Sequence, residues 1–265
     1  MTARAFLVRG LLAGLLAGLA TFFVAHQVGE PHVEAAIALE EAGSASEQTT
    51  EHGHSDATEE HSHSHEEDGT VVTRHNQRTW GLLTGTVTVG VALGGVVALV
   101  AAGVAGRMRR LTLGQSTALV SAIGFVSFAL VPFLKYPATP PAVGDGDTIG
   151  HRTGVYFGFL LVSVVVAIAV TVLAVRLTRR IGTYGAVVGG VAAYLVVMVV
   201  AGQLFPTVNE IGDFPADTLW YFRRASLITL ATLWTVIGVA LTGLLLRLQS
   251  QERVVVARRE LAASL

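Results

Sequence analysis

The stretch VPFLKYPATPPAVGDGDTIGHRTGVYF, from Val131 to Phe157, decides how the rest of the chain is arranged. It contains the only lysine of the chain, Lys135. Two adjacent prolines, Pro140 and Pro141, exclude a helix in its middle. Apolar, glycine-rich segments lie on both sides of it. We therefore expect an irregular polar connection between two membrane-embedded helices.

The composition outside this stretch is that of a membrane protein. Hydrophobic residues make up 52% of the 265 residues and charged residues only 14%, which indicates several membrane spans. A chain of this length has no room for both a spanning bundle and a large soluble domain. There is no cysteine, and this excludes disulfides, thiolate metal sites and thiol nucleophiles.

Six apolar stretches are long enough to cross about 30 Å of hydrocarbon as helices. The predicted fold class is therefore all-α: a polytopic integral membrane protein with six transmembrane helices. The first stretch is alternatively a cleaved signal peptide, but TFFVAHQ offers no small-x-small cleavage site, which favours a retained anchor. The predicted spans are Ala5–Ala25, Trp80–Ala105, Leu111–Leu134, Thr153–Val175, Tyr184–Phe205 and Ala225–Leu246.

Arginine and lysine predict the orientation of these spans. Of the 18 such residues, 12 flank the spans on one side, and the richer side is usually cytoplasmic. We therefore expect both termini in the cytoplasm. The predicted organisation is a first helix over 1–25, an extracytoplasmic, flexible, histidine-rich and acidic loop over 26–79, and a five-helix membrane domain over 80–265. That domain has extracytoplasmic loops at 132–152 and 206–224 and a short cytoplasmic tail.

The first helix carries glycines at four-residue spacing, at Gly10, Gly14 and Gly18. This spacing places them on one helix face, where the backbone of another helix can approach closely. We expect a tightly packed neighbouring helix, and the alternative is a glycine-lined path or hinge.

The long loop contains EHGHSDATEEHSHSHEEDG, from Glu51 to Gly69. A segment this polar cannot bury a core, so we expect it to be disordered. Imidazole binds Zn²⁺, Cu²⁺, Ni²⁺ and Co²⁺, and carboxylates complete such ligand shells. The tract predicts metal capture with poor selectivity; the alternative is a solvated acidic linker. The five predicted tract ligands are His52, His54, His61, His63 and His65.

Titratable residues are absent from the centres of the apolar stretches. This argues against a pump with a carboxylate relay in the middle of the membrane. We predict that His26, Glu30 and Glu210, at the extracytoplasmic ends, pass metal from the tract to a path between the helices. The lysine does not lie in a phosphate-binding Walker loop, so nucleotide is not expected. Nucleic acid is not an expected partner either, and no nucleophile–base pair predicts an enzyme.

The extracytoplasmic loops carry a second set of polar and proline residues. We interpret them as a salt-bridged structural lid or, alternatively, a substrate gate. Pro132 and Pro137 are expected to interrupt the end of the third helix. Asp213 and Pro215 also predict a helix that starts at Pro215, with Asp217 in its first turn. The predicted structural or gating residues are Lys135, Pro137, Pro140, Pro141, Asp145, Asp147, Arg152, Asn209, Asp213, Arg223 and Arg224.

Four motifs give the chain a resemblance to a known family. They are RGLLAGLLAG at Arg9–Gly18, VPFLKYPATPPAVG at Val131–Gly144, DTIGHRTGVYF at Asp147–Phe157 and FPTVNEIGDFPADTLWYFRRASL at Phe205–Leu227. Together they resemble the CbtA family of predicted cobalt transporter proteins. The resemblance implies a small polytopic membrane protein that moves cobalt for cobalamin synthesis. It also implies a partner, CbtB, which is a small single-span protein with histidines near a terminus.

These observations together predict uptake of a divalent transition metal across a prokaryotic plasma membrane. Co²⁺ is the expected cargo, with Ni²⁺ or Zn²⁺ as alternatives, and no permanently bound cofactor is expected. The expected partners are membrane lipid, the metal ion and a CbtB-like protein. One alternative is an accessory or sensor protein that binds metal without a transport pathway of its own. Another is a membrane enzyme acting on a lipid or a cobalamin precursor.

Overall fold

The computed structural model describes residues 2–51, 73–107 and 111–264. In this part of the chain every regular element is helical, as the sequence predicts. The elements are α1 (Ala3–Val24), η1 (Ala25–Gly29), α2 (Glu30–Glu51), α3 (Arg74–Asn76), η2 (Gln77–Gly81), α4 (Leu82–Val104), α5 (Leu113–Gly124), η3 (Phe125–Leu130), α6 (Val131–Lys135), η4 (Gly146–Thr148), α7 (Ile149–Leu204) and α8 (Ala216–Ala263).

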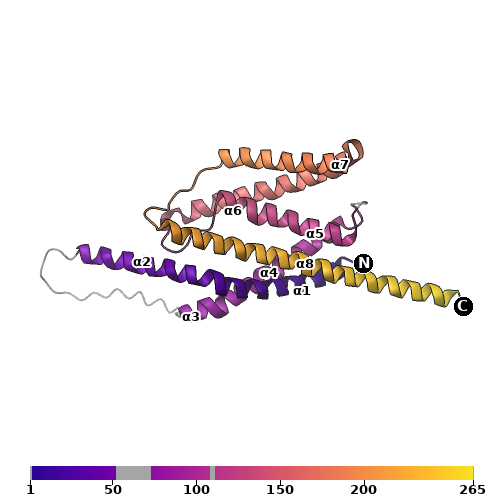
Figure 1. Ribbon diagram of the computed structural model, residues 1–265, viewed down its shortest axis with the longest axis horizontal. Helices are drawn as coiled ribbons and strands as arrows, with labels where there is room; N and C mark the ends of the chain where they lie inside the picture. The colour runs from indigo at the N-terminus through magenta and orange to yellow at the C-terminus, as the bar shows by residue number, and fades with distance from the viewer. Residues whose placement is uncertain (1, 52–72, 108–110, 265) are drawn as a thin grey trace.

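Five continuous helical stretches in the described residues are long and apolar enough to cross a membrane. One of them contains α7, which is not straight. Gly182 has φ 77° and ψ 168°, a conformation that only glycine adopts readily. The chain folds back there into a helical hairpin (Figure 1). The two arms correspond to the fourth and fifth predicted spans, and the number of six crossings stays a prediction.

The predicted close approach to the first helix is confirmed, and the partner is α4. A Cβ placed on Gly14 would lie 2.8 Å from both the carbonyl carbon of Gly90 and the Cα of Val91. A Cβ on Gly94 would lie 2.7 Å from the Cα of Gly14. No side chain fits at such distances, so backbone packs directly on backbone.

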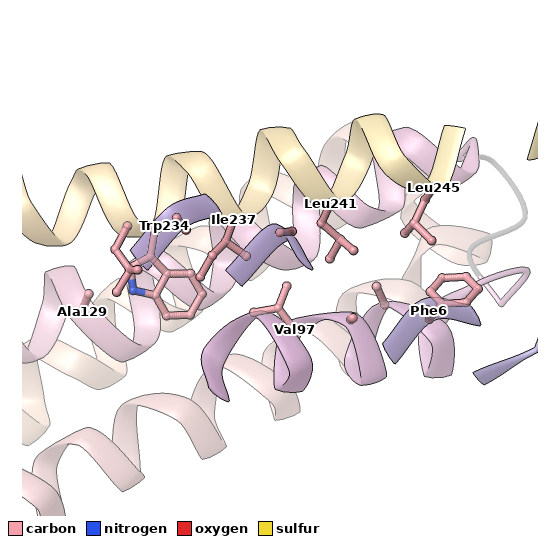
Figure 2. Close-up of a cluster of buried hydrophobic side chains, with 12 residues drawn as sticks. Phe6, Val97, Ala129, Trp234, Ile237, Leu241 and Leu245 are labelled. Atoms are coloured by element: carbon pink, nitrogen blue, oxygen red, sulfur yellow. The ribbon is translucent and has the colours of Figure 1, made fainter. Parts of the chain in front are cut away.

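Helix α8 packs along this glycine-packed pair and completes the main core. Trp234, Ile237, Leu241 and Leu245 follow one another along α8 at helical spacing and are all buried (Figure 2). They contact Val97 and other residues of α1, α4 and η3. The apolar stripe therefore binds four segments into one unit.

A second, smaller core joins the α7 hairpin to the rest of the bundle. Its buried members are Phe159, Ala167, Tyr194, Met198 and Ala201. The Ser163 hydroxyl donates to the Ser127 carbonyl at 2.7 Å and lies 2.8 Å from the Tyr194 hydroxyl. These polar groups are satisfied by one another inside the bundle.

The prediction of a loop that begins at residue 26 is wrong for its described part. Helix α1 continues through η1 into α2 as far as Glu51. The segment EAAIALEEAG has high helix propensity, since alanine, leucine and glutamate dominate it. The chain is helical again from Arg74. The flexibility and the extracytoplasmic side of the segment stay predictions.

The predicted interruption of the third helix at Pro132 is wrong, because a π-helical turn precedes this proline. Proline has no N–H to donate to the preceding turn. In η3 the hydrogen bonding shifts, and the N–H of Val131 donates to the carbonyl of Val126. The helix then continues to Lys135, and Tyr136 leaves it directly before Pro137.

The last helix begins where the sequence predicts but ends much later. Its first residue is Ala216, directly after Pro215, and Asp217 lies in its first turn, which confirms the predicted start. The expected short tail after Leu246 is instead helical as far as Ala263. Both termini lie toward the same end of the bundle, as does the α7 bend (Figure 1). The assignment of that end to the cytoplasm stays a prediction.

Candidate functional site

A cavity of about 1040 Å³ lies where the connections between α6 and α7 and between α7 and α8 converge. We call it the loop-end cavity. Its walls come from the α1–α2 junction, the start of α4, the helix α6, both connections, the first turns of α7 and residues 222–230 of α8. Its polar and charged lining residues include Glu30, Lys135, Tyr136, Thr139, Arg152, Thr153, Tyr156, Thr207, Asn209, Glu210, Arg223, Ser226 and Thr229.

An ion pair between Arg152 and Glu210 joins the two connections at this cavity. The Arg152 Nε lies 3.3 Å from Glu210 Oε2, and both side chains are largely shielded. The same carboxylate oxygen accepts from the Thr148 hydroxyl at 2.8 Å and from the Asp145 N–H at 3.2 Å. The Arg152 guanidinium also donates to the Asp145 carbonyl at 2.8 Å. We call this group of four residues the latch.

The latch depends on an unusual backbone shape just before it. Gly144 has φ 99°, a value that favours glycine. A Cβ there would also lie 2.6 Å from the guanidinium carbon of Arg152. Glycine is therefore required both for the turn and for the approach of the arginine.

Tyr136 ties the same two connections together a short distance away. Its hydroxyl donates to the Pro206 carbonyl at 2.6 Å. Its ring contacts Phe159 edge-on, and Phe159 in turn contacts Phe205. Burial raises the pKa of Tyr136 above its ordinary value, so the hydroxyl keeps its proton and remains a donor at neutral pH.

A second group of ion pairs joins α2 to α3 and η2, the two short elements that precede α4. The Arg74 guanidinium lies 2.5 Å from Glu30 Oε2. One helical turn further, Arg78 pairs with Glu34. His26 Nδ1 lies 3.2 Å from the Arg78 carbonyl. His26, Glu30 and Glu34 therefore form one face of the α1–α2 helix, and we call this group with its two arginines the neck clamp.

The predicted metal ligands are not gathered into one centre by the described part of the chain. Glu30 and Glu210 both line the loop-end cavity, but each is paired with an arginine. His26 stacks on Phe22 and is not a lining residue. Within residues 2–51, 73–107 and 111–264, no three His, Cys, Asp or Glu side chains are grouped to hold a metal. The tract ligands His52, His54, His61, His63 and His65 lie outside the described residues.

The predicted structural and gating residues have varied surroundings. Lys135 lies 5.5 Å from the ring centroid of Tyr136, and Arg223 Nε donates to the Ala138 carbonyl at 3.4 Å. Arg224 lies over the Tyr221 ring, which stacks on His32 of α2. Pro137 and Asn209 line the cavity, and Pro140 is buried but is not a lining residue. Pro141 is half-buried, and the Asp147 N–H donates to the Asp145 carboxylate. Asp213 is exposed.

Sequence reasoning missed three residues that organise this end of the bundle. Arg74, Arg78 and Glu34 form the ion pairs of the neck clamp, but their charge alone assigns them no role. The signal available in the sequence was their spacing: Glu30 and Glu34 are four residues apart, and so are Arg74 and Arg78. Two such faces with opposite charge are complementary when both are helical.

Comparison with known proteins places the chain in a family. A family model described as "Probable cobalt transporter subunit (CbtA)" matches residues 3–246. The chain belongs to the CbtA family. CbtA proteins are described as transporter subunits, so this chain is a multi-pass membrane protein of metal transport rather than a member of an enzyme family. The word subunit indicates a partner in a transport complex, and the spanning helices imply contact with lipid. No curated protein and no solved structure matches the chain.

Proposed function

We propose that this CbtA protein takes up a divalent transition metal, Co²⁺, across the plasma membrane of a prokaryote for cobalamin synthesis. The observation that carries the proposal is the family match over residues 3–246. In this proposal the chain crosses the membrane six times, and the α7 hairpin supplies two of the crossings. Both termini are cytoplasmic, and the loop-end cavity opens toward the outside.

The metal route begins at the histidine tract, where His52, His54, His61, His63 and His65 gather ions. From there the ions pass to His26, Glu30 and Glu210. Two of these groups line one cavity, which supports a shared route. Each carboxylate is bound to an arginine, which already neutralises part of the negative charge that attracts a cation. In this proposal the handover therefore includes a rearrangement of the neck clamp or the latch that frees the carboxylate from its arginine.

Cellular metal content tests the proposed cargo. Cells with and without the chain are grown with equal Co, Ni, Zn and Cu, and each metal is measured by mass spectrometry. We expect a chain-dependent rise in cobalt that exceeds the rise in the other metals. A tract variant with all five histidines replaced by alanine is expected to gain less cobalt at low external concentration. Equal cobalt with and without the chain contradicts the proposal.

The family description, which names a transporter subunit, favours a second candidate function. In it the chain is a metal-binding accessory or sensor, and the pathway for the ion belongs to a partner such as a CbtB-like single-span protein. Cobalt flux into liposomes that hold only this chain separates the two functions. Flux above that of empty liposomes supports a carrier. Flux that appears only after the partner is added supports the accessory.

A further inference from the structure

The charge of the loop-end cavity is not what a binding site for a bare cation requires. Its carboxylates are neutralised by arginines, Glu30 by Arg74 and Glu210 by Arg152. Two further cations remain in the lining, and neither has a carboxylate partner among the described residues. The charged lining residues in the described part are Glu30, Lys135, Arg152, Glu210 and Arg223.

The two unneutralised cations, Lys135 of α6 and Arg223 of α8, both line the cavity. Arg223 Nε donates to the Ala138 carbonyl, and Ala138 lies three residues after Lys135. This bond uses one nitrogen of the guanidinium. The terminal nitrogens of Arg223 have no acceptor within the described residues. A guanidinium held in this way offers a pre-oriented pair of donors to an oxygen anion.

We propose that the loop-end cavity binds an anionic ligand whose carboxylate or phosphate oxygens are held by Lys135 and Arg223. A bare divalent cation would meet two positive side chains there and no unpaired carboxylate of the described chain. An anion gains charge-assisted hydrogen bonds from both. The volume of about 1040 Å³ is sufficient for a ligand much larger than a hydrated ion.

The proposal goes beyond metal uptake and does not depend on it. Two sources supply the same chemistry. One is a soluble polycarboxylate, alone or as a chelate that carries the metal as a negatively charged complex. The other is the headgroup of an anionic phospholipid. The cavity volume admits the polycarboxylate, and the apolar side chains of Leu134, Ile149 and Phe157, which line the cavity and remain more than half exposed, suit the acyl chains of a lipid.

Citrate binding to the purified full-length chain tests the site. The protein is placed in nanodiscs of phosphatidylcholine, and citrate affinity is measured by isothermal titration calorimetry at constant pH and ionic strength. We expect wild type to bind citrate. Lys135→Gln and Arg223→Gln are each expected to weaken binding about tenfold, the effect of removing one charged hydrogen-bond donor.

Arg224→Gln is the matched control. Arg224 is the next residue on α8, has the same charge and lies over the Tyr221 ring outside the cavity lining. We expect its citrate affinity to equal that of wild type. The Lys135→Gln variant is the one of the two whose folding is less at risk, since among the described residues Lys135 has only a ring contact to lose. Equal citrate affinity in wild type and both cavity variants overturns the proposal, and so does an equal loss in Arg224→Gln.

Two further arms identify the source of the anion. Cobalt citrate is titrated in place of citrate, and the citrate titration is repeated in nanodiscs that contain phosphatidylglycerol. Cobalt citrate binding that depends on Lys135 and Arg223 supports the chelate. Loss of citrate binding in phosphatidylglycerol, with retention in phosphatidylcholine, supports the lipid headgroup. A cobalt citrate signal or a phosphatidylglycerol effect that persists unchanged in Lys135→Gln and Arg223→Gln overturns the proposal, because the anion then does not depend on these two cations.

Discussion

The residue that connects most of the candidate site is Glu210. One oxygen of its carboxylate accepts from Thr148 and Asp145 and faces Arg152. A partly shielded pair with several shared donors contributes more than an exposed pair does. Glu210 therefore links the connection before α7 to the connection after it, and its stabilising effect depends on Arg152.

A double-mutant cycle measures this link. Glu210→Gln and Arg152→Gln are each expected to lower the unfolding temperature of the detergent-solubilised protein. The double variant is expected to lose less than the sum, with a coupling of about 1 kcal/mol. Asp213→Asn, an exposed carboxylate on the same connection, is the control and should leave the unfolding temperature unchanged. Additive losses would show that the two residues do not act as a pair.

The neck clamp gives a second prediction at the scale of single residues. In the tract variant without its five histidines, Arg74→Gln frees the Glu30 carboxylate, which Arg74 holds at 2.5 Å. Co²⁺ binding should then rise several-fold, since no positive side chain neutralises the carboxylate or repels the cation any longer. Glu30→Gln added to Arg74→Gln should remove the gain. Unchanged Co²⁺ affinity in Arg74→Gln would exclude Glu30 as a ligand.

For single residues, the sequence shows which side chains stand out but not which other residues they contact. Glu210 and Arg152 stand out as charges in a proline- and glycine-rich setting, but they are 58 positions apart. No local rule pairs residues at that separation. The pairing follows from the α7 hairpin, which brings the two ends of a long element together. The contact between Gly144 and Arg152 is equally hidden, because the sequence does not show that the arginine packs against this turn.

Among the elements, α1 and α4 have a contact in which backbone lies directly on backbone and leaves no room for a side chain. Gly14→Ala is expected to lower stability by about 1–3 kcal/mol, because the new methyl group overlaps the backbone of Gly90. Gly85→Ala is the matched control. Gly85 also lies in this helix pair, in α4, but nothing lies within 4 Å of its would-be Cβ. Thermal unfolding of both variants in the same detergent compares them, and equal losses would contradict the packing account.

The elements themselves are predictable to different degrees. Apolar length finds where the membrane helices lie but not where they end, because lipid leaves the backbone no alternative to helix while the polar ends extend further. It does not find α2, which is polar and extends the first span by propensity. The π-helical turn before Pro132 is also hidden, since it depends on how the surrounding helices accommodate a missing N–H.

For the whole molecule, the length of α8 fixes the relation between its two ends. From Ala216 to Ser250 the helix extends about 51 Å, more than the roughly 30 Å of hydrocarbon. Asp213 and Ser250 must therefore lie on opposite sides if α8 crosses the membrane. The chain has no cysteine, so a single introduced cysteine is the only thiol of the protein that a maleimide can label.

We expect an impermeant maleimide added to intact cells to label Asp213→Cys and not Ser250→Cys. Permeabilised cells should give labelling of both, which controls for reactivity. The opposite pattern would invert the sidedness on which the uptake proposal depends. Labelling of both in intact cells would mean that α8 does not cross the membrane.

Because α1 continues through η1 into α2 without a break, a tilt of the buried part of this helical stretch would also move its far end. Residues 3–43 form one continuous helical stretch, and beyond the last ion pair of the neck clamp, at Glu34, α2 extends about 26 Å further to Glu51. A tilt of about 5° in the buried portion would move the far end by about 2 Å. Small changes in bilayer thickness would thus be magnified into displacement at Glu51, where the histidine tract is attached.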